Sequence, residues 1–339
     1  MRKQINILYV GNDLTLKTGY NSTIAVLSKL LMENFQVKVV SNKQNKFQRL
    51  LDMCLTVIKR RNKTDYILID TFSTSNFYFA LIVSQLARLF NIKYIPILHG
   101  GNLPYRLERS KWLSNKIFLY SYANVAPSHY LKNAFQNKGF GVIFIPNILT
   151  ISDYSFKSRK SIKPNLLWVR AFNKTYNPVM AIEVLNLLRE HYPEAKLCMI
   201  GPFKDASYQD VLDRIKKYNL ENGIEITGVL PRRKWLKKSA AYDVFINTTD
   251  FDNTPVSVME AMALGLPIVS TNAGGLPFLI DDKNDGILVD KNDAKQMVKE
   301  IVKLLKNPLI AYKLAAEARK KAESFDWENV KQKWYRVIK

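Results

Sequence analysis

The chain has 339 residues, enough for two domains of ordinary size that each bury a core. Its 51 lysines and arginines against 29 acidic residues give a formal net charge of +22 at pH 7. Residues 1–150 hold most of this excess, with 20 basic and 6 acidic side chains. Such a charge favours an anionic partner (nucleic acid, anionic lipid or a phosphorylated substrate), although a charged surface also serves solubility alone.

Cys54 and Cys198 lie far apart in apolar segments, which argues against a disulfide framework or a cysteine metal cluster and favours a reducing cytoplasm. The N-terminus runs directly into an apolar strand and lacks the features of a signal peptide. The most apolar stretch, residues 77–90, is interrupted by polar side chains and is too short to span a bilayer. We therefore expect a buried helix there.

Strand-length and helix-length signals alternate through the first 150 residues. A strand over 5–10 is followed by a polar loop containing Thr18 and Gly19, and then by a helix over 20–34. The loop lacks the full G-x-G-x-x-G spacing, so a dinucleotide fingerprint is not supported. Further strands are expected at residues 37–40, 66–70, 93–98, 124–126 and 142–145. Repeated strand and helix units predict a doubly wound parallel sheet.

A histidine and two glycines, His99-Gly100-Gly101, follow the strand expected at 93–98. In doubly wound sheets the ligand crevice lies beyond the carboxyl ends of the strands. A single histidine is more often structural than functional, but this position favours a site role for His99.

Residues 151–164 show no hydrophobic periodicity and are predicted to be a linker. The alternation of strands and helices then restarts, which predicts a second domain of the nucleotide-binding type over 165–325. We expect the C-terminal helix, 326–339, to pack back toward the first domain, which covers 1–150. Strands of the second domain are expected at residues 165–169, 196–200, 224–227, 244–247, 267–271 and 286–289.

Two cations, Arg170 and Lys174, follow directly on the first strand of the second domain. One interpretation is a pair of surface side chains on a turn. The other is a clamp for an anionic leaving group, because arginine offers a planar fork to phosphate oxygens and lysine a point charge.

The segment 247–279 has the most completely specified local chemistry. Thr254 is a good N-cap and Pro255 fits the first helical position, which predicts a helix that continues to Leu264. Gly265 then supplies a left-handed turn before the strand at 267–271.

A second helix start follows at Ala273-Gly274-Gly275-Leu276. Its small side chains would let a ligand approach the backbone amides closely, as in phosphate-binding turns.

Two acids, Asp252 and Glu260, lie in the same segment with no cation beside them. Such residues are usually solvated. The helix that carries Glu260 is apolar nearly all round, however, which favours a role facing a ligand.

These residues resemble the retaining glycosyltransferases of family 4, which have the GT-B architecture of two facing Rossmann-like domains. The resemblance covers nearly the whole chain. The family's E-x7-E segment, with the strand and glycine turn that follow it, resembles N-T-T-D-F-D-N-T-P-V-S-V-M-E-A-M-A-L-G-L-P-I-V-S-T-N-A-G-G-L-P. Other landmarks resemble L-L-W-V-R-A-F-N-K-T-Y-N-P, A-P-S-H-Y-L-K-N and F-I-P-N-I-L.

The resemblance implies transfer of a sugar from a UDP-linked or GDP-linked donor to an acceptor, with retention at the anomeric carbon, no cofactor and no required metal. It implies a lipid-linked or oligosaccharide acceptor, as in the synthesis of lipopolysaccharide, capsule or exopolysaccharide. The absence of a convincing catalytic base fits a front-face substitution in which the leaving phosphate takes the acceptor's proton.

The resemblance also assigns residues in the second domain. Glu260 would bind the ribose hydroxyls, and Asp252 would face the donor sugar, although it is one methylene shorter than the family's glutamate. The donor-binding segment further includes Asn253, Thr254, Gly274, Gly275 and Leu276, the last three through their backbone amides.

Arg170 and Lys174 resemble the pair that neutralises the leaving group, but Lys174 stands one residue closer to the arginine than is usual. An alignment of the following helices gives that position to Tyr176 instead. In the first domain, Gly19 resembles the glycine that touches the diphosphate, and His99 resembles the histidine beside the reacting carbon.

Asp250 and Asp252 also spell the D-x-D that binds metal in the other large glycosyltransferase fold. Two acids alone are a weak metal signature, and arginine and lysine can neutralise the same charge. We therefore predict no metal site.

Two alternatives remain at this point. The first is a nucleotide-sugar epimerase or another GT-B enzyme that never transfers to an acceptor, which the basic first domain disfavours. The second is a basic nucleic-acid-binding protein, which lacks any supporting motif, so we expect no nucleic acid partner.

The basic first half instead suggests docking on an anionic membrane, at the inner face of the cell membrane. The best single patch is Lys59-Arg60-Arg61 with Lys63, which follows the apolar residues 50–58.

Overall fold

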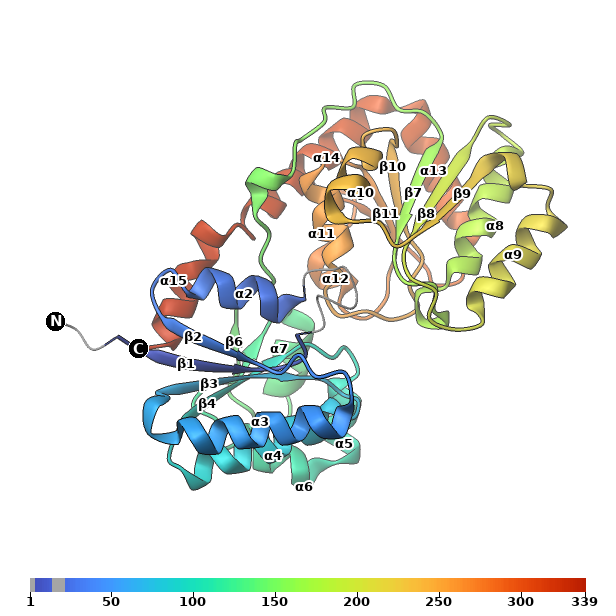
Figure 1. The fold of residues 1–339 in the computed structure, drawn as a ribbon. Helices are drawn as coiled ribbons and strands as arrows, with labels where there is room; N and C mark the ends of the chain where they lie inside the picture. Colours follow the sequence, from blue (N-terminus) through green and yellow to red (C-terminus); the bar gives the residue numbers. More distant parts are fainter. Residues whose placement is uncertain (1–3, 14–21) are drawn as a thin grey trace. The chain divides into compact units, whose positions relative to one another are not determined.

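The chain forms two compact α/β units. The computed structural model describes residues 4–13 and 22–339, so the loop expected around Gly19 lies outside the described residues. One unit comprises Met1–Ile148 with Trp327–Lys339, and the other comprises Leu149–Asp326. Each contains one six-stranded sheet in which every pair of neighbours is parallel (Figure 1). The predicted doubly wound α/β fold is confirmed.

The sheet of the first unit has the strand order β2-β1-β3-β4-β5-β6. The direction of strand addition reverses between β1 and β3, and such a switch point is where doubly wound sheets place a ligand crevice. The strands are β1 (Asn6–Val10), β2 (Gln36–Val40), β3 (Tyr66–Thr71), β4 (Lys93–Leu98), β5 (Val125–Ala126) and β6 (Ile143–Phe144).

Helices cover both faces of this sheet (Figure 1). Buried side chains of α2 and α15 form one core with the strands, and those of α3 and α4 form another on the opposite face. The C-terminal helix therefore belongs to this unit, where Trp334 is buried. The helices are α2 (Thr23–Leu31), α3 (Lys46–Arg60), α4 (Asn76–Leu89), α5 (Leu103–Arg109), α6 (Lys111–Phe118), α7 (His129–Gln136) and α15 (Trp327–Val337).

The helix expected to be buried over residues 77–90 is α4, and only one of its faces is covered. Tyr78, Ile82 and Leu89 are exposed on the other. The prediction of a buried helix is wrong for that face, because α4 carries apolar side chains on both faces while neighbouring elements cover only one of them. No helix in the described part of the chain is both long enough and apolar enough to cross a membrane.

The sheet of the second unit has the strand order β12-β11-β10-β7-β8-β9, and its switch point lies between β7 and β10. Its strands are β7 (Asn165–Val169), β8 (Lys196–Ile200), β9 (Ile224–Gly228), β10 (Val244–Asn247), β11 (Ile268–Thr271) and β12 (Ile287–Val289).

The two faces of this sheet carry separate cores. Side chains of α8, α9 and α13 fill one, and α11 and α12 contribute to the other. The helices are α8 (Pro178–Arg189), α9 (Ser207–Lys217), α10 (Arg232–Ser239), α11 (Val256–Ala263), α12 (Leu276–Leu279), α13 (Ala294–Lys306) and α14 (Pro308–Glu323).

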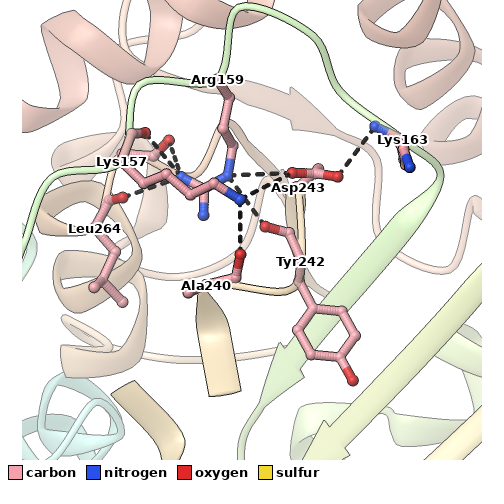
Figure 2. Close-up of polar contacts among 8 residues, drawn as sticks. Lys157, Arg159, Lys163, Ala240, Tyr242, Asp243 and Leu264 are labelled. Atoms are coloured by element: carbon pink, nitrogen blue, oxygen red, sulfur yellow. Dashed lines mark hydrogen bonds and ion pairs between the residues drawn. The ribbon is translucent and has the colours of Figure 1, made fainter. Parts of the chain in front are cut away.

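Residues 151–164, expected to be a linker, form part of the second unit. Figure 2 shows how Arg159 fastens them there. Its guanidinium is buried, donates to the carbonyl oxygens of Leu264 (3.1 Å) and Gly265 (2.8 Å), and lies 3.5 Å from a carboxylate oxygen of Asp243. A buried charge needs such partners, so this segment is held by specific bonds although it lacks periodic apolar residues.

Candidate active site

Two loops meet at the switch point of the second sheet, one after β7 and one after β10. Trp168 Nε1 donates to Thr248 Oγ1 (3.0 Å), and the amide of Asp250 donates to the carbonyl oxygen of Thr175 (2.8 Å). The first bond joins β7 to the loop after β10, and the second joins the two loops. The loop after β10 is thereby held against the residues that follow β7.

This arrangement places Asp252 in an ion pair with Arg170, through Arg170 Nη2 and Asp252 Oδ2. Asp252 Oδ1 accepts from the amide of Asn253 (2.7 Å), whereas Asp252 Oδ2 has the ion pair but no hydrogen bond among the described residues. Arg170 Nε is likewise buried and has no hydrogen-bond partner among the described residues. Leaving a buried donor unsatisfied is costly, and an anionic ligand oxygen would satisfy it.

The two candidates for the second leaving-group contact are placed differently. The ring of Tyr176 lies under the Arg170 guanidinium, 4.3 Å from ring centroid to guanidinium carbon, whereas the side chain of Lys174 is exposed. Burial lowers the pKa of the Arg170 guanidinium, and the Tyr176 hydroxyl opposes that shift. Lys174 contributes its amide to Asp205 Oδ2 (2.9 Å).

The glycine turn packs directly on the loop that carries Asp252. A Cβ atom on Gly274 would lie 2.2 Å from the Asp252 carbonyl oxygen, and one on Gly275 would lie 1.8 Å from that of Asn253. Gly274 also has φ +57°, which favours glycine. The glycines thus permit close approach between two protein segments.

Two of the three amides expected to face a ligand are engaged within the protein. The Gly275 amide donates to the Asp252 carbonyl oxygen (2.9 Å), and the Leu276 amide donates to that of Ala273 (3.1 Å). The bond from Gly275 fixes the backbone of the residue that pairs with Arg170. The turn therefore positions Asp252.

The helix after this loop begins one residue later than expected. Pro255 occupies the N-cap position with an extended backbone and no side-chain cap bond, and α11 starts at Val256. The prediction of Thr254 as the N-cap is wrong, because the backbone before it is held against the glycine turn. Gly265, with φ +71°, ends the helix as expected.

Glu260 projects from α11 into a separate polar cluster of the second unit. Tyr154 Oη donates to Glu260 Oε1 (2.7 Å), and Arg232 Nη2 donates to Tyr154 Oη (2.5 Å). Arg232 Nε lies 3.9 Å from Glu260 Oε1. Burial raises the pKa of Glu260 to about 7, and the bond from Tyr154 and the charge of Arg232 oppose the rise.

His99 directly follows β4 in the first unit and is held by residues from neighbouring strands. His99 Nε2 lies 2.8 Å from Asp70 Oδ1, which also accepts from Tyr9 Oη (2.9 Å). Phe72 stacks on the imidazole at a centroid distance of 5.3 Å. Burial and Asp70 raise the pKa of Tyr9. The contact at Nε2 fixes the ring orientation.

The pair Asp250 and Asp252 does not converge on one point, because Asp252 turns to Arg170 while Asp250 Oδ1 lies 3.5 Å from the side-chain amide of Asn177. Burial raises the pKa of Asp250. The described residues contain no group of three or more histidine, cysteine, aspartate or glutamate side chains placed to hold a metal ion.

The residues that hold His99 and Glu260 were not predicted from the sequence. Asp70 ends a predicted strand, and the rule about strand ends that selected His99 would have found it too. Tyr154 and Arg232 carried no such signal, because they lie 106 and 28 positions from Glu260 in irregular sequence contexts.

A family model described as "Glycosyl transferases group 1" matches residues 151–325. The sulfoquinovosyl transferase SQD2 of Arabidopsis thaliana is 28% identical over 152 residues, which are 43% of this chain and 28% of that protein. The putative colanic acid biosynthesis glycosyltransferase WcaL of Escherichia coli K12 is 31% identical over 130 residues, 36% of this chain and 31% of WcaL. The chain thus spans about a third of the length of these two relatives.

Solved glycosyltransferase structures share the fold across the whole chain. HepE of Anabaena, solved in complex with UDP and glucose, superposes with a TM-score of 0.77 at 17% identity and covers 99% of both chains. Sucrose-phosphate synthase of Thermosynechococcus elongatus superposes with a TM-score of 0.84 at 15% identity and covers 98% of both chains. These likenesses show the GT-B fold.

Proposed function

The chain belongs to the glycosyl transferases group 1 family, and on that premise we propose that it transfers a sugar from a nucleotide diphosphate sugar to a glycan or lipid-linked acceptor. The observation that carries the proposal is the buried Nε of Arg170 at the switch point of the second sheet, which has no hydrogen-bond partner in the part of the chain that the structure describes. A leaving diphosphate supplies the anionic oxygens that such a donor requires.

In this proposal Arg170 stabilises the negative charge that develops on the leaving phosphate. Asp252 keeps the guanidinium in place, and its carboxylate orients the donor sugar beside it. Fixed charges of this kind need no reorganisation during the reaction, which makes them effective in catalysis. Asn253, Thr254 and the backbone of Gly274 complete the donor site.

Glu260 would accept hydrogen bonds from the ribose hydroxyls, and the family resemblance assigns further donor contacts to Gly19 and His99. The reaction would proceed with retention and without metal, the leaving phosphate taking the acceptor's proton. Support for this comes from the cation at the proposed leaving-group position and the absence of a motif for a catalytic base in the sequence.

Similar proteins support the proposed classes of donor and acceptor. HepE was solved with UDP, which favours a UDP-linked donor over a GDP-linked one. Relatives named for colanic acid and amylovoran biosynthesis favour a polysaccharide product. An acceptor in a membrane would also explain the basic first half, so we place the enzyme at the anionic inner face of the cell membrane.

Binding and turnover test this proposal in two steps. UDP should raise the midpoint of thermal unfolding, and Arg170→Met should reduce that shift without changing the midpoint of the free protein by more than a few degrees. UDP release from UDP-sugars should then require an acceptor and persist in excess EDTA. If no nucleotide shifts the midpoint, the proposal is wrong.

The nature of the product separates the proposal from its rivals. A retained anomeric configuration in the isolated glycan, read by NMR coupling constants, supports the transfer described above. Conversion of the donor without any acceptor would instead identify an epimerase. Tight binding of nucleic acid at physiological salt, with no response to nucleotide sugars, would favour the nucleic-acid alternative.

A further inference from the structure

Helix α3 has two apolar faces, and only one of them is buried. Met53 and Val57 pack into the core beneath the sheet. Phe47, Leu51, Leu55 and Ile58 are spaced by four, four and three residues, which places them on one stripe, and all four are exposed. Phe47 is 75% exposed. The stripe points away from the core that Met53 and Val57 enter.

Neighbouring helices repeat this pattern. On α4, Tyr78, Ile82 and Leu89 share one exposed stripe, while the residues opposite them enter the core. Trp112 on α6 and Leu119 directly after it are also exposed. Helix α4 packs against both α3 and α6 on the same side of the sheet (Figure 1), and we infer that their exposed stripes form one surface. We call this surface the outer face, made up of Phe47, Leu51, Leu55, Ile58, Tyr78, Ile82, Leu89, Trp112 and Leu119.

Cations border the outer face. Residues 43–122 contain 13 lysines and arginines against 4 acidic residues. Lys59, Arg60, Arg61 and Lys63 are exposed at the end of α3. Such a border complements an anionic surface, and the aliphatic stems of these side chains can lie along apolar neighbours.

A hollow of about 780 Å³ lies at the same border, next to Leu89. Its lining includes Arg88 and Lys93, and each cation lies over the ring of a tyrosine: Arg88 over Tyr120 at 3.9 Å and Lys93 over Tyr122 at 4.6 Å. Tyrosine and tryptophan favour the interface between water and lipid, where an apolar ring and a polar tip are both accommodated.

We propose that the outer face docks the first unit on an anionic lipid bilayer surface. The apolar stripes enter the boundary between headgroups and acyl chains, and the bordering cations contact lipid phosphates. Nine large apolar side chains spread over three adjacent helices form a broad surface and not a single pocket, which suits a bilayer better than an inserted peptide segment.

Docking would bring the enzyme to a lipid-linked acceptor in the membrane, and in that respect the proposal rests on the proposed function. The stripe of α3 begins at Phe47, shortly after the carboxyl end of β2. His99 follows the carboxyl end of β4, and in a parallel sheet these ends share one edge. A docked layer would therefore extend to the edge of the first unit that carries His99.

Vesicle flotation with the full chain tests the docking. The protein should float with phosphatidylcholine vesicles that contain about one third phosphatidylglycerol, and not with phosphatidylcholine alone. Leu51→Ser with Leu55→Ser should lower the partition coefficient about tenfold. Lys59→Gln, Arg60→Gln and Arg61→Gln together should lower it about a hundredfold, because each cation contributes about fivefold.

Leu309→Ser with Ile310→Ser is the matched control, because both residues are exposed on α14 of the second unit. This pair should not change flotation. If the control and the outer-face variants lose flotation equally, the effect is nonspecific and the proposal is wrong.

Trp112 provides a direct measurement of insertion. It is 66% exposed, whereas the other four tryptophans, Trp168, Trp235, Trp327 and Trp334, are buried. Lipids brominated on the acyl chain should quench the fluorescence of the bound protein, and Trp112→Phe should remove the quenched component without changing flotation more than about twofold.

Two outcomes contradict the proposal. One is a wild-type chain that does not float with anionic vesicles. The other is a dimer, seen by analytical ultracentrifugation, that the outer-face variants dissociate while vesicles have no effect, which would make the face a contact between copies. Thermal shifts with UDP on the same variants test the proposed function separately. A chain that floats with vesicles but binds no nucleotide would support the docking surface and contradict the proposed function.

Discussion

The candidate site residues of the two units are held in similar ways. In the first unit, His99 follows a strand, contacts Asp70 and stacks on Phe72. In the second, Arg170 follows a strand, pairs with Asp252 and lies over Tyr176. Each unit thus presents one nitrogen-bearing side chain at a strand end, fixed by one carboxylate and one aromatic ring.

The two arrangements differ in how the carboxylate is brought into place. Asp70 belongs to β3, the strand next to β4, so sheet register alone sets it beside His99. Asp252 lies in a loop, and the turn of Gly274 and Gly275 fixes its backbone. The first arrangement should therefore tolerate changes in loops, whereas the second should depend on them.

The largest effect is expected from removing the charge in the second unit. Arg170→Met should lower kcat about a thousandfold, because a preorganised cation at the leaving group is lost. Asp252→Asn replaces the carboxylate that pairs with Arg170 by an amide of about the same size. It should lower kcat less than Arg170→Met does. Steady-state rates of UDP release measure both. Near-normal turnover of Arg170→Met would show that the cation lies elsewhere.

The carboxyl group of Glu260 has a raised pKa, mainly because it is buried. Its raised pKa means that the folded protein binds this proton more tightly than the unfolded chain, so wild-type stability falls as pH rises from 4.5 to about 7. Glu260→Gln has no proton to lose. The free energy of unfolding of the variant relative to wild type should therefore rise by about 3 kcal/mol across this window.

Urea unfolding at about pH 4 and about pH 8 measures this change for Glu260→Gln. Glu194 is exposed, so Glu194→Gln is the control and should show no such dependence. If the free energy of unfolding of Glu260→Gln relative to wild type is the same at both pH values, Glu260 does not lie in a desolvated environment.

In the first unit, Asp70→Asn should lower kcat about a hundredfold, because His99 loses the acceptor that orients it. The affinity for UDP should stay within about twofold, since the nucleotide is proposed to bind the second unit. Tyr9→Phe is the matched control, because it removes only the other bond to Asp70 and should cost less than about threefold in kcat. Equal losses in both variants would indicate general destabilisation.

Gly275→Ala tests the loop dependence of the second arrangement. Its Cβ would lie 1.8 Å from the Asn253 carbonyl oxygen, so the turn must move and stability should fall by about 2 kcal/mol. Gly141→Ala is the control, because its Cβ would meet no atom within 4 Å. Urea unfolding compares the two variants. A neutral Gly275→Ala would mean that the turn does not fix Asp252.

The smallest effect distinguishes Tyr176 from Lys174. Tyr176→Leu removes the half-buried ring beside the guanidinium and should lower kcat about threefold, in line with about 0.5–1 kcal/mol for a cation–π contact that is not fully desolvated. Lys174→Ala should leave kcat unchanged, because its side chain is exposed and its charge acts on Asp205. If kcat falls more in Lys174→Ala than in Tyr176→Leu, Lys174 is the second cation at the leaving group.

The sequence was sufficient to predict the two α/β units and several site positions. Buried parallel strands appear as apolar, β-branched runs, and their carboxyl ends share one edge, so strand order along the chain already marks where ligands bind. His99, Arg170 and Asp252 could be selected on this basis, because the signal is local. The glycine turn could also be found, but its effect on Asp252 could not.

Only the tertiary structure identified the partners of these residues. Tyr154 and Glu260 are 106 positions apart, and no local pattern links them. The outer face could not be predicted either, because apolar side chains occur on both the covered and the exposed face of α4, and periodicity does not say which side neighbouring helices cover. Burial depends on packing between distant segments, and this is why the sequence predicted a buried helix where the structure shows an exposed apolar stripe.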